Sequence, residues 1–350
     1  MQQSYLSYKG VSASYEPKNS ILKNVSFELL EGELGCLLGP SGCGKTTILK
    51  TISGFQSVDS GSIHLAGKKI SSSTRAVPAE KRNIGMVFQD HALFPHLTLA
   101  QNVGFGLHKL DKISASKQVD KMFELVSMSE LKDAYPSEIS GGQSQRIAIA
   151  RALAPEPNLL LMDEPFSNLD SSLRERLGFE VRQLLKDAGI TAIMVTHDQH
   201  DAFALGDKVG VIANGELQQW SSPFELYHAP NNRFVAEFVG EGVFIDGALK
   251  DANTVATAFG LIRGGSTNKN YKKESVKILL RPDDVIHRTN GPIKATVKRK
   301  AFKGAQTLYT LETQTGETLL SLLPSHEDFA IEEQIQVAIE ADHLVIFENI

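Results

Sequence analysis

The sequence predicts an α/β fold for the first part of the chain and a small all-β domain for the rest. Short apolar runs alternate with helix-forming stretches up to about residue 240, which is typical of a parallel sheet flanked by helices. Beyond that point, short strand-like runs are separated by Gly, Pro, Asn and acidic residues, as in a small OB-like β-barrel. We therefore expect one domain over 1–240, with a separate helical subdomain at about 94–153, and a second domain over 241–350.

A glycine-rich loop lies between the apolar run 34–38 and a helix-forming stretch at 46–52. A solvated turn could carry the same letters, but a strand before the loop and a helix after it favour a P-loop. Glycines let backbone N–H groups turn toward phosphate oxygens, and the helix N-terminus adds its positive dipole end. The lysine of such a loop contacts the β and γ phosphates, and the next hydroxyl ligates Mg²⁺. The residues expected to bind a nucleotide here are Gly39, Pro40, Ser41, Gly42, Cys43, Gly44, Lys45, Thr46 and Thr47.

Two adjacent carboxylates end the apolar run 159–162. Such a run predicts a buried parallel strand whose carboxyl end faces a ligand crevice. Because side chains alternate along a strand, Asp163 and Glu164 point different ways and can do different work. Downstream of a P-loop, we expect Asp163 to hold Mg²⁺, as Thr46 does, and Glu164 to polarise the attacking water as general base. The alternative is an acidic strand end that begins a turn at Pro165.

A second candidate phosphate-binding end consists of Ser140, Gly141, Gly142 and Gln143, which precede a helix-forming stretch at 145–153. Alone, this pattern more often marks an ordinary helix N-cap. Together with the P-loop and the acidic strand end, it resembles the signature motif of ABC ATPases. That resemblance implies an ABC ATPase cassette that uses ATP and Mg²⁺. It also implies that two copies pair head to tail, with each ATP between the P-loop of one copy and the signature of the other.

The resemblance covers about the first two-thirds of the chain and implies roles for further residues. Tyr15 matches the aromatic residue that stacks on adenine, and Gln89 matches the glutamine that reaches Mg²⁺ and the attacking water. His197 matches the switch histidine at the γ phosphate, so Glu164, His197 and Gln89 are the expected catalytic residues. The segment 167–170 looks like the loop that crosses the dimer interface. Each residue also has a plainer interpretation, for example as a surface aromatic, an exposed amide or one of ten histidines.

Composition limits the partners and the compartment. The net charge is −5 and nothing indicates the clustered basic face that nucleic-acid binding normally needs. A basic loop at 269–273 is expected to be a solvated surface loop. Cys36 and Cys43 are the only cysteines and stand too close together for a plausible disulfide, so we expect a reducing compartment. The first residues lack the basic and apolar regions of a signal peptide, and no run approaches the length of a membrane-spanning helix, so we expect any membrane association to come from a partner.

A cassette followed by such a barrel resembles the ATPases of bacterial importers that use a periplasmic binding protein. The segments 91–98 and 280–283 look like that group, and 238–244 is similar to the ferric-iron uptake ATPases. The resemblance implies a homodimer at the cytoplasmic face of the inner membrane, bound to an integral membrane permease and, through it, to a periplasmic or lipid-anchored solute-binding protein. We expect ATP-driven uptake of ferric iron. Polyamine, sugar or another solute stays open, as does a sensing or merely dimerising role for the barrel.

Other P-loop classes fit the sequence less well. Soluble ABC ATPases of translation or DNA repair usually carry two cassettes or a long coiled-coil insertion, whereas this chain has a single P-loop and no sustained heptads. A P-loop kinase of small molecules would leave the signature, the pairing loop and the barrel without a role. An exporter ATPase is disfavoured by the barrel.

Overall fold

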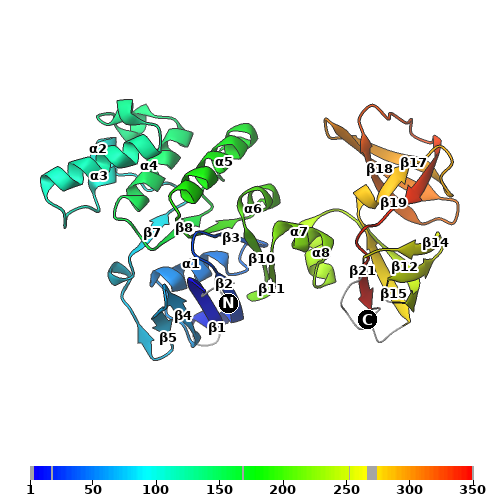
Figure 1. Ribbon diagram of the computed structural model, residues 1–350, viewed down its shortest axis with the longest axis horizontal. Coiled ribbons are helices and arrows are strands. Elements are labelled where there is room, and N and C mark those ends of the chain that lie inside the picture. Colours follow the sequence, from blue (N-terminus) through cyan, green and yellow to red (C-terminus); the bar gives the residue numbers. More distant parts are fainter. Residues whose placement is uncertain (1–3, 17–18, 168, 252, 266–273, 349–350) are drawn as a thin grey trace. The chain divides into compact units, whose positions relative to one another are not determined.

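The computed structural model of the chain describes residues 4–16, 19–167, 169–251, 253–265 and 274–348 (Figure 1). The chain forms two compact units, Met1–Pro223 and Phe224–Ile350. Two features of the sequence lie outside the described residues: Asn168 of the expected pairing loop and the basic loop at 269–273. Among the helices of the described residues, none has the length and apolar character needed to cross a membrane.

The first unit is built around a six-stranded sheet in the order β11-β10-β3-β9-β8-β7. Its strands are parallel except for β11, which pairs antiparallel with β10. The bounds are β3 Leu34–Leu38, β7 Ile84–Val87, β8 Leu159–Asp163, β9 Ala192–Thr196, β10 Lys208–Ala213 and β11 Glu216–Ser221. Every residue of β3 and β9 is buried, which explains their uninterrupted apolar sequences. The predicted parallel sheet is confirmed.

A second sheet of the first unit, in the order β2-β1-β4-β5-β6, was not foreseen in the sequence. Its strands are antiparallel and span β1 Leu6–Glu16, β2 Asn19–Leu29, β4 Ser60–Leu65, β5 Lys68–Ser72 and β6 Arg75–Ala76. Helix α1, Lys45–Ser53, lies between the two sheets (Figure 1). Its Ile48 and Ile52 share one core with Phe27 of β2 and Leu161 of β8. Because α1 is buried from both sides, the end of the P-loop that it carries is firmly held.

A helical part is inserted in the chain between β7 and β8. It consists of α2 Leu99–Gly104, α3 Lys112–Leu125 and α4 Gly141–Leu153, with short 3₁₀ turns at Ser129–Leu131 and Pro136–Glu138. These helices lie within the segment 94–153, and α4 begins at Gly141, before the expected helix-forming stretch at 145–153. The reason is a capping box in which Ser140 and Gln143 bond each other's backbone N–H groups and so extend the helix to Gly141.

The remaining helices of the first unit follow strands of the parallel sheet. Helix α5, Ser171–Asp187, comes after β8, and α6, Gln199–Leu205, comes after β9. A further 3₁₀ turn, Ala79–Lys81, precedes β7. Asp170 and Asp198 begin α5 and α6 as N-caps, because their carboxylates accept the backbone N–H groups of Leu173 and His200.

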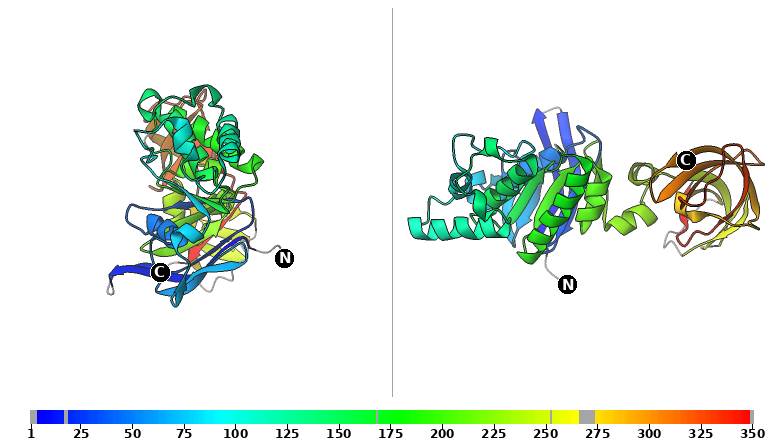
Figure 2. Two further views of the ribbon diagram at one scale, coloured as in Figure 1. Left: turned by 90° about the vertical axis from the view of Figure 1, so that its left-hand side faces the viewer. Right: turned by 90° about the horizontal axis from the view of Figure 1, so that it is seen from above.

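The second unit contains two five-stranded sheets, in the orders β14-β13-β12-β15-β21 and β16-β20-β17-β18-β19. The strands are β12 Val243–Asp251, β13 Thr254–Thr257, β14 Gly260–Arg263, β15 Ser275–Leu280, β16 Val285–His287, β17 Ile293–Phe302, β18 Gln306–Thr313, β19 Thr318–Pro324, β20 Gln334–Ile339 and β21 Val345–Glu348. One core joins both sheets, with Ile278 and Val255 from the first and Val297 and Leu311 from the second. Figure 2 shows these strands curving around that core, which confirms the predicted barrel-like, all-β domain.

Helices α7, Pro223–His228, and α8, Arg233–Val239, precede the strands of the second unit. The sequence-based boundary at residue 240 would place them with the first domain, whereas the compact units divide before Phe224. The buried side chain of Arg281, which follows β15, explains this difference. Its guanidinium donates to the carbonyls of Ala236, Gly240 and Tyr227, and so fastens both helices to the barrel.

Candidate active site

The P-loop turns between β3 and α1, and its shape depends on glycine at two positions. Gly44, the N-cap of α1, has φ 107°, a left-handed conformation that other residues rarely adopt. At Gly39 a Cβ atom would lie 2.2 Å from the carbonyl oxygen of Ile212 in the neighbouring strand β10, so no side chain fits there. The two glycines thus allow the backbone to wrap closely around the start of the helix, as the sequence predicts.

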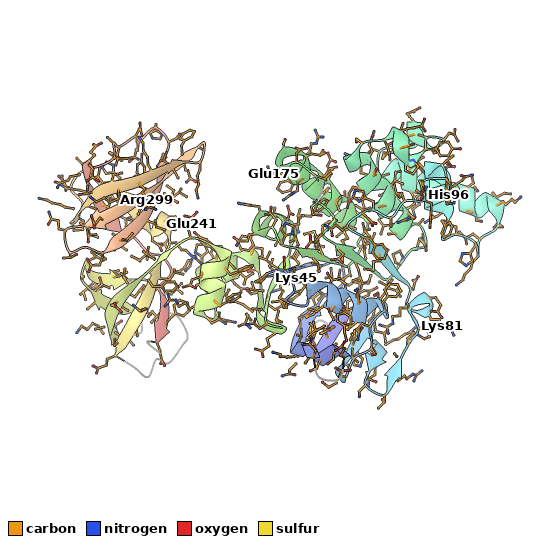
Figure 3. All side chains as sticks on the ribbon, turned by 180° about the vertical axis from the view of Figure 1, so that it is seen from behind. Lys45, Lys81, His96, Glu175, Glu241 and Arg299 are labelled. Atoms are coloured by element: carbon orange, nitrogen blue, oxygen red, sulfur yellow. The ribbon has the colours of Figure 1, made fainter. Side chains whose placement is uncertain are left out.

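Lys45 lies at the first position of α1 and is buried (Figure 3). Its ammonium group donates hydrogen bonds to the carbonyls of Gly39, at 2.6 Å, and Pro40, at 3.0 Å. The charge is therefore held inside the curl of the loop. An ammonium in that position is a point charge for the terminal phosphates of a nucleotide whose other oxygens meet the loop N–H groups.

Thr46 and Asp163 bring two oxygen ligands together across α1 and the carboxyl end of β8. The Thr46 hydroxyl donates to Asp163 Oδ1 at 3.2 Å. Burial raises the pKa of Asp163, and the hydrogen bond from Thr46 opposes this shift. A buried carboxylate beside a hydroxyl is a set of hard oxygen donors, which fits Mg²⁺ completed by phosphate oxygens and water. Gln89 follows β7, whose last residue Val87 pairs with Met162 of β8, so the glutamine belongs to the same sheet edge.

Glu164 and His197 form the second pair at this edge. Glu164 Oε2 lies 3.1 Å from His197 Nδ1. The two residues follow the adjacent parallel strands β8 and β9, and the Glu164 N–H donates to the Val195 carbonyl of β9 at 3.0 Å. Glu164 has φ 46°, a left-handed conformation that residues other than glycine rarely adopt. Strained backbone at an acidic residue of this kind is a frequent mark of function.

Tyr15 lies against the first turn of α1. Its hydroxyl is 3.3 Å from Thr47 Oγ1, and the Lys50 ammonium is 5.6 Å from the centre of the ring. The side chain is nevertheless 54 % exposed. An exposed aromatic face beside the phosphate loop can stack on a nucleobase. This position also brings Thr47 next to Tyr15, at one end of the expected nucleotide site.

The four signature residues lie apart from the P-loop of their own chain. Ser140 and Gly141 are exposed at the start of α4, in the helical part, whereas α1 lies on the other side of β7 and β8 in Figure 1. The side chains of Ser140 and Gln143 accept hydrogen bonds from each other's backbone N–H groups, and Gly142 is buried. The structure therefore assembles Lys45, Thr46, Asp163, Glu164 and His197 in one chain but does not bring the signature to them.

One arginine at this site was not identified from the sequence. Arg174, on the first turn of α5, donates to Asp198 Oδ2 at 2.7 Å and to the Leu169 carbonyl at 3.3 Å. It thereby connects the expected pairing loop with the residue that follows His197. Arg174 lies one helical turn beyond the N-cap Asp170, and this spacing is the one sequence signal that could have indicated it.

Comparison with known proteins identifies the family of the chain. The ABC transporter family matches residues 22–167, and the TOBE domain matches residues 278–347. A protein named Fe(3+) ions import ATP-binding protein FbpC, from Fusobacterium nucleatum, is 38 % identical over 337 residues, which cover 94 % of this chain and 90 % of that protein. The chain belongs to the ABC transporter family.

The chain is also similar to a second import protein and to a solved structure. The spermidine/putrescine import ATP-binding protein PotA of Oleidesulfovibrio alaskensis is 42 % identical over 292 residues, which cover 81 % of this chain and 77 % of that protein. The solved structure of cbiO1 from Clostridium perfringens, described as part of the ABC transporter complex cbiONQ, superposes with a TM-score of 0.60 at 30 % identity. It covers 64 % of this chain and 90 % of that one. The first unit thus has the ABC ATPase fold.

The span of the ABC transporter match separates the candidate residues into two groups. Lys45, Gln89, Ser140 and Glu164 lie inside residues 22–167. Tyr15 and His197 lie outside it, so their assignment depends on their distances from Thr47 and Glu164 and on the longer similarity to the two import proteins.

Proposed function

We propose that this chain is the ATP-hydrolysing subunit of an ABC importer and that the imported solute is ferric iron. The observation that carries the proposal is the pairing of Glu164 with His197, 3.1 Å apart, at the sheet edge where Thr46 and Asp163 also meet. A carboxylate held in place beside a phosphate loop can act as the general base of nucleotide hydrolysis. The names of the two import ATP-binding relatives support the transport role.

In the proposed reaction, the loop N–H groups and Lys45 hold the phosphates of ATP, and Tyr15 stacks on the adenine. The Glu164 carboxylate accepts the proton of the attacking water, while His197 orients that carboxylate and contacts the γ phosphate. Thr46, Asp163 and Gln89 are the residues that would hold Mg²⁺, which when bound neutralises charge on the β- and γ-phosphate oxygens. Positioning and charge neutralisation supply most of the rate in phosphoryl transfer.

The separation of the signature from the P-loop supports a head-to-tail homodimer. Ser140, Gly141, Gly142 and Gln143 of each copy would complete the site around Lys45 of the other. ATP binding closes the dimer, hydrolysis reopens it, and the segment 89–96 transmits the movement to an integral membrane permease. The structural similarity to cbiO1, part of a transporter complex, supports a permease partner. The chain would act as a peripheral protein at the cytoplasmic face of the inner membrane, with a solute-binding protein beyond the permease.

The catalytic assignment is tested with purified protein and Glu164→Gln. We expect the variant to bind ATP with the parental affinity but to lose hydrolysis by about 10²-fold or more, because a general base contributes about that much. Lys45→Ala should lose ATP binding. Glu156→Gln is a matched control, since Glu156 is an exposed surface residue paired with Lys121. Hydrolysis at the parental rate by Glu164→Gln would overturn the assignment.

The solute is tested by uptake of labelled ferric iron, spermidine and maltose in cells that lack the chain. Iron is proposed because the similarity to FbpC covers 94 % of the chain, against 81 % for PotA, although PotA has the higher identity. Polyamine uptake is therefore the second candidate. Selective loss of iron uptake, restored by the parental chain but not by Glu164→Gln, is the expected result. Selective loss of spermidine uptake would replace the solute and keep the mechanism. No loss at all would favour a soluble ABC ATPase.

A further inference from the structure

Arg151 makes two contacts that no sequence motif accounts for. It lies near the end of α4, the helix that begins at the signature. One guanidinium nitrogen donates to the Ala92 carbonyl at 2.6 Å and the other to the His91 carbonyl at 2.8 Å. The guanidinium also lies 5.6 Å from the centre of the Phe94 ring. A planar guanidinium that donates to two successive carbonyls fixes both the position and the orientation of that backbone segment. The single ammonium of a lysine cannot do so.

The segment that Arg151 holds has an unfavourable backbone. His91 and Ala92 have φ values of 61° and 48°, so two successive residues with side chains adopt the left-handed conformation. Each such residue is destabilised by its Cβ atom, and the arrangement persists only where surrounding contacts enforce it. The His91 N–H also donates to the Phe88 carbonyl at 2.9 Å, which closes a turn around Gln89.

We propose that Arg151 is a positioning residue that holds the turn at 91–92 in its left-handed form and thereby fixes Gln89 relative to the signature helix. The proposal rests on the proposed function, because it takes Gln89 as a residue that acts on ATP. Helix α4 is a single rigid element of 13 residues that begins at the signature and carries Arg151 near its other end. A displacement of the signature on meeting the partner copy's nucleotide is therefore passed to Gln89 through Arg151.

Arg146 provides a matched control on the same helix. It donates to the Val126 carbonyl at 3.3 Å and pairs with Glu180, so its loss also removes a carbonyl contact and a positive charge. Neither contact of Arg146 touches the segment 88–94. A general weakening of α4 should therefore appear in Arg146→Ala as well as in Arg151→Ala, whereas a loss of the Gln89 turn should appear only in the latter.

The first measurement is hydrogen–deuterium exchange of the backbone amides at 88–97 in the full chain without nucleotide. We expect Arg151→Ala to accelerate their exchange by about tenfold or more, Arg151→Lys to give a smaller acceleration, and Arg146→Ala to leave them unchanged. This measurement does not depend on ATP hydrolysis, so it remains informative even if the proposed function fails. Unchanged exchange in Arg151→Ala, or equal acceleration in Arg146→Ala, would overturn the proposal.

The second measurement is steady-state ATP hydrolysis. Arg151→Ala should lower kcat by about tenfold with KM for ATP changed by less than about twofold, because Lys45 and Tyr15 lie on other elements. Adding Ala92→Gly should recover part of kcat and slow the amide exchange, since glycine adopts a positive φ without help. The same substitution in the parental chain should change little. Failure of Ala92→Gly to rescue either property would show that Arg151 acts in some other way. Loss of hydrolysis in Glu164→Gln checks the proposed function separately.

Discussion

Arg281 is expected to hold the two helices of the second unit onto its barrel, and the substitution Arg281→Met tests this. The side chain is only 3 % exposed. It donates to the carbonyls of Ala236, Gly240 and Glu241 at 3.0, 2.7 and 3.1 Å, and to that of Tyr227 at 3.3 Å. Three of these carbonyls lie in the last turn of α8 or just beyond its end, where the chain has no helical partner for them.

The expected loss of stability comes from the carbonyl groups that no longer receive a hydrogen bond. A buried carbonyl without a partner costs about 1–3 kcal/mol, and Arg281→Met would leave one buried carbonyl and three partly buried ones facing an apolar side chain. Removing a buried cation regains part of its desolvation cost. We therefore expect the free energy of unfolding of the second unit to fall by about 3 kcal/mol, with methionine filling most of the volume.

The assay is urea unfolding followed by hydrogen-exchange pulse labelling, with the peptides that cover 275–347 reporting the second unit. The control is Arg288→Met, because Arg288 forms an exposed ion pair with Glu340 that should contribute only about 0–1 kcal/mol. The amides of α8 should lose protection in Arg281→Met and keep it in Arg288→Met. A loss of less than about 1 kcal/mol in Arg281→Met, or an equal loss in the control, would refute the role assigned to these carbonyl contacts.

Three further predictions concern the first unit. Burial raises the pKa of Asp163, so the folded chain favours the protonated acid, and the stability this confers is lost as pH rises through the folded pKa. Asp163→Asn should therefore raise the melting temperature of the ATP-free chain at pH near 8, and this gain should shrink toward about pH 4. The same substitution should abolish hydrolysis. A melting temperature below that of the parental chain at pH near 8 would contradict the prediction. Burial likewise raises the pKa of the Cys43 thiol, so alkylation at pH near 7 should be much slower than for free cysteine when followed by intact mass; rapid labelling would disprove it. Asn102 is fully buried and bonds both the N–H and the carbonyl of Phe94, so Asn102→Ala should cost about 2 kcal/mol in urea unfolding, and a neutral result would exclude this role.

The parts of the fold that the sequence predicts are those in which one local pattern dominates. The run 34–38 coincides with β3, and the P-loop comes directly after it, because a strand buried on both faces must be apolar throughout. The antiparallel sheet was missed for the opposite reason. Strand β1 pairs with β2 through repeated register shifts from Tyr8 onward, and in β1 the alternation of apolar and polar residues that reveals a half-buried strand is interrupted around Gly10.

The prediction of an all-β second domain depends on the strand-like runs 276–280, 293–297, 307–311, 318–323, 335–339 and 344–347, which all lie within or overlap strands β15 and β17–β21. Strands β12, β13, β14 and the three-residue β16 were not foreseen. Strand β12 has Asp246 and Lys250 among its apolar residues, and β13 and β14 have only four residues each. Their sequences therefore cannot be distinguished from those of loops. They form a sheet because β12 pairs with the strongly apolar β15, a long-range partner that no local window contains.

The residues of the candidate site likewise fall into those that a local sequence pattern reveals and those that it does not. Motifs that act through local backbone shape, such as the P-loop and the capping box at Ser140, are visible as short strings of residues. Arg151 and Arg174 are not, because their partners lie in segments outside their own helices. Arg151 donates to backbone carbonyls, which have the same chemistry whichever residue carries them, and Arg174 donates to the Asp198 carboxylate as well as to the Leu169 carbonyl. Such contacts are specified by the packing of α4 and α5, so they become evident only in the structure.

The way the helical part joins the sheet indicates which of its connections can move. It is inserted between neighbouring strands, and its return connection is fastened to the start of β7: the Asn158 N–H donates to the Asn83 carbonyl at 2.9 Å, and the Asn83 amide donates to the Glu156 carbonyl at 3.2 Å. The outgoing connection leaves the opposite end of β7 and contains Gln89. Because the return connection is fastened to the start of β7, a rotation of the helical part relative to the sheet displaces the outgoing connection most. That connection lies beside the candidate active site. Placing Gln89 there, under the hold of Arg151, makes the glutamine sensitive to the position of α4.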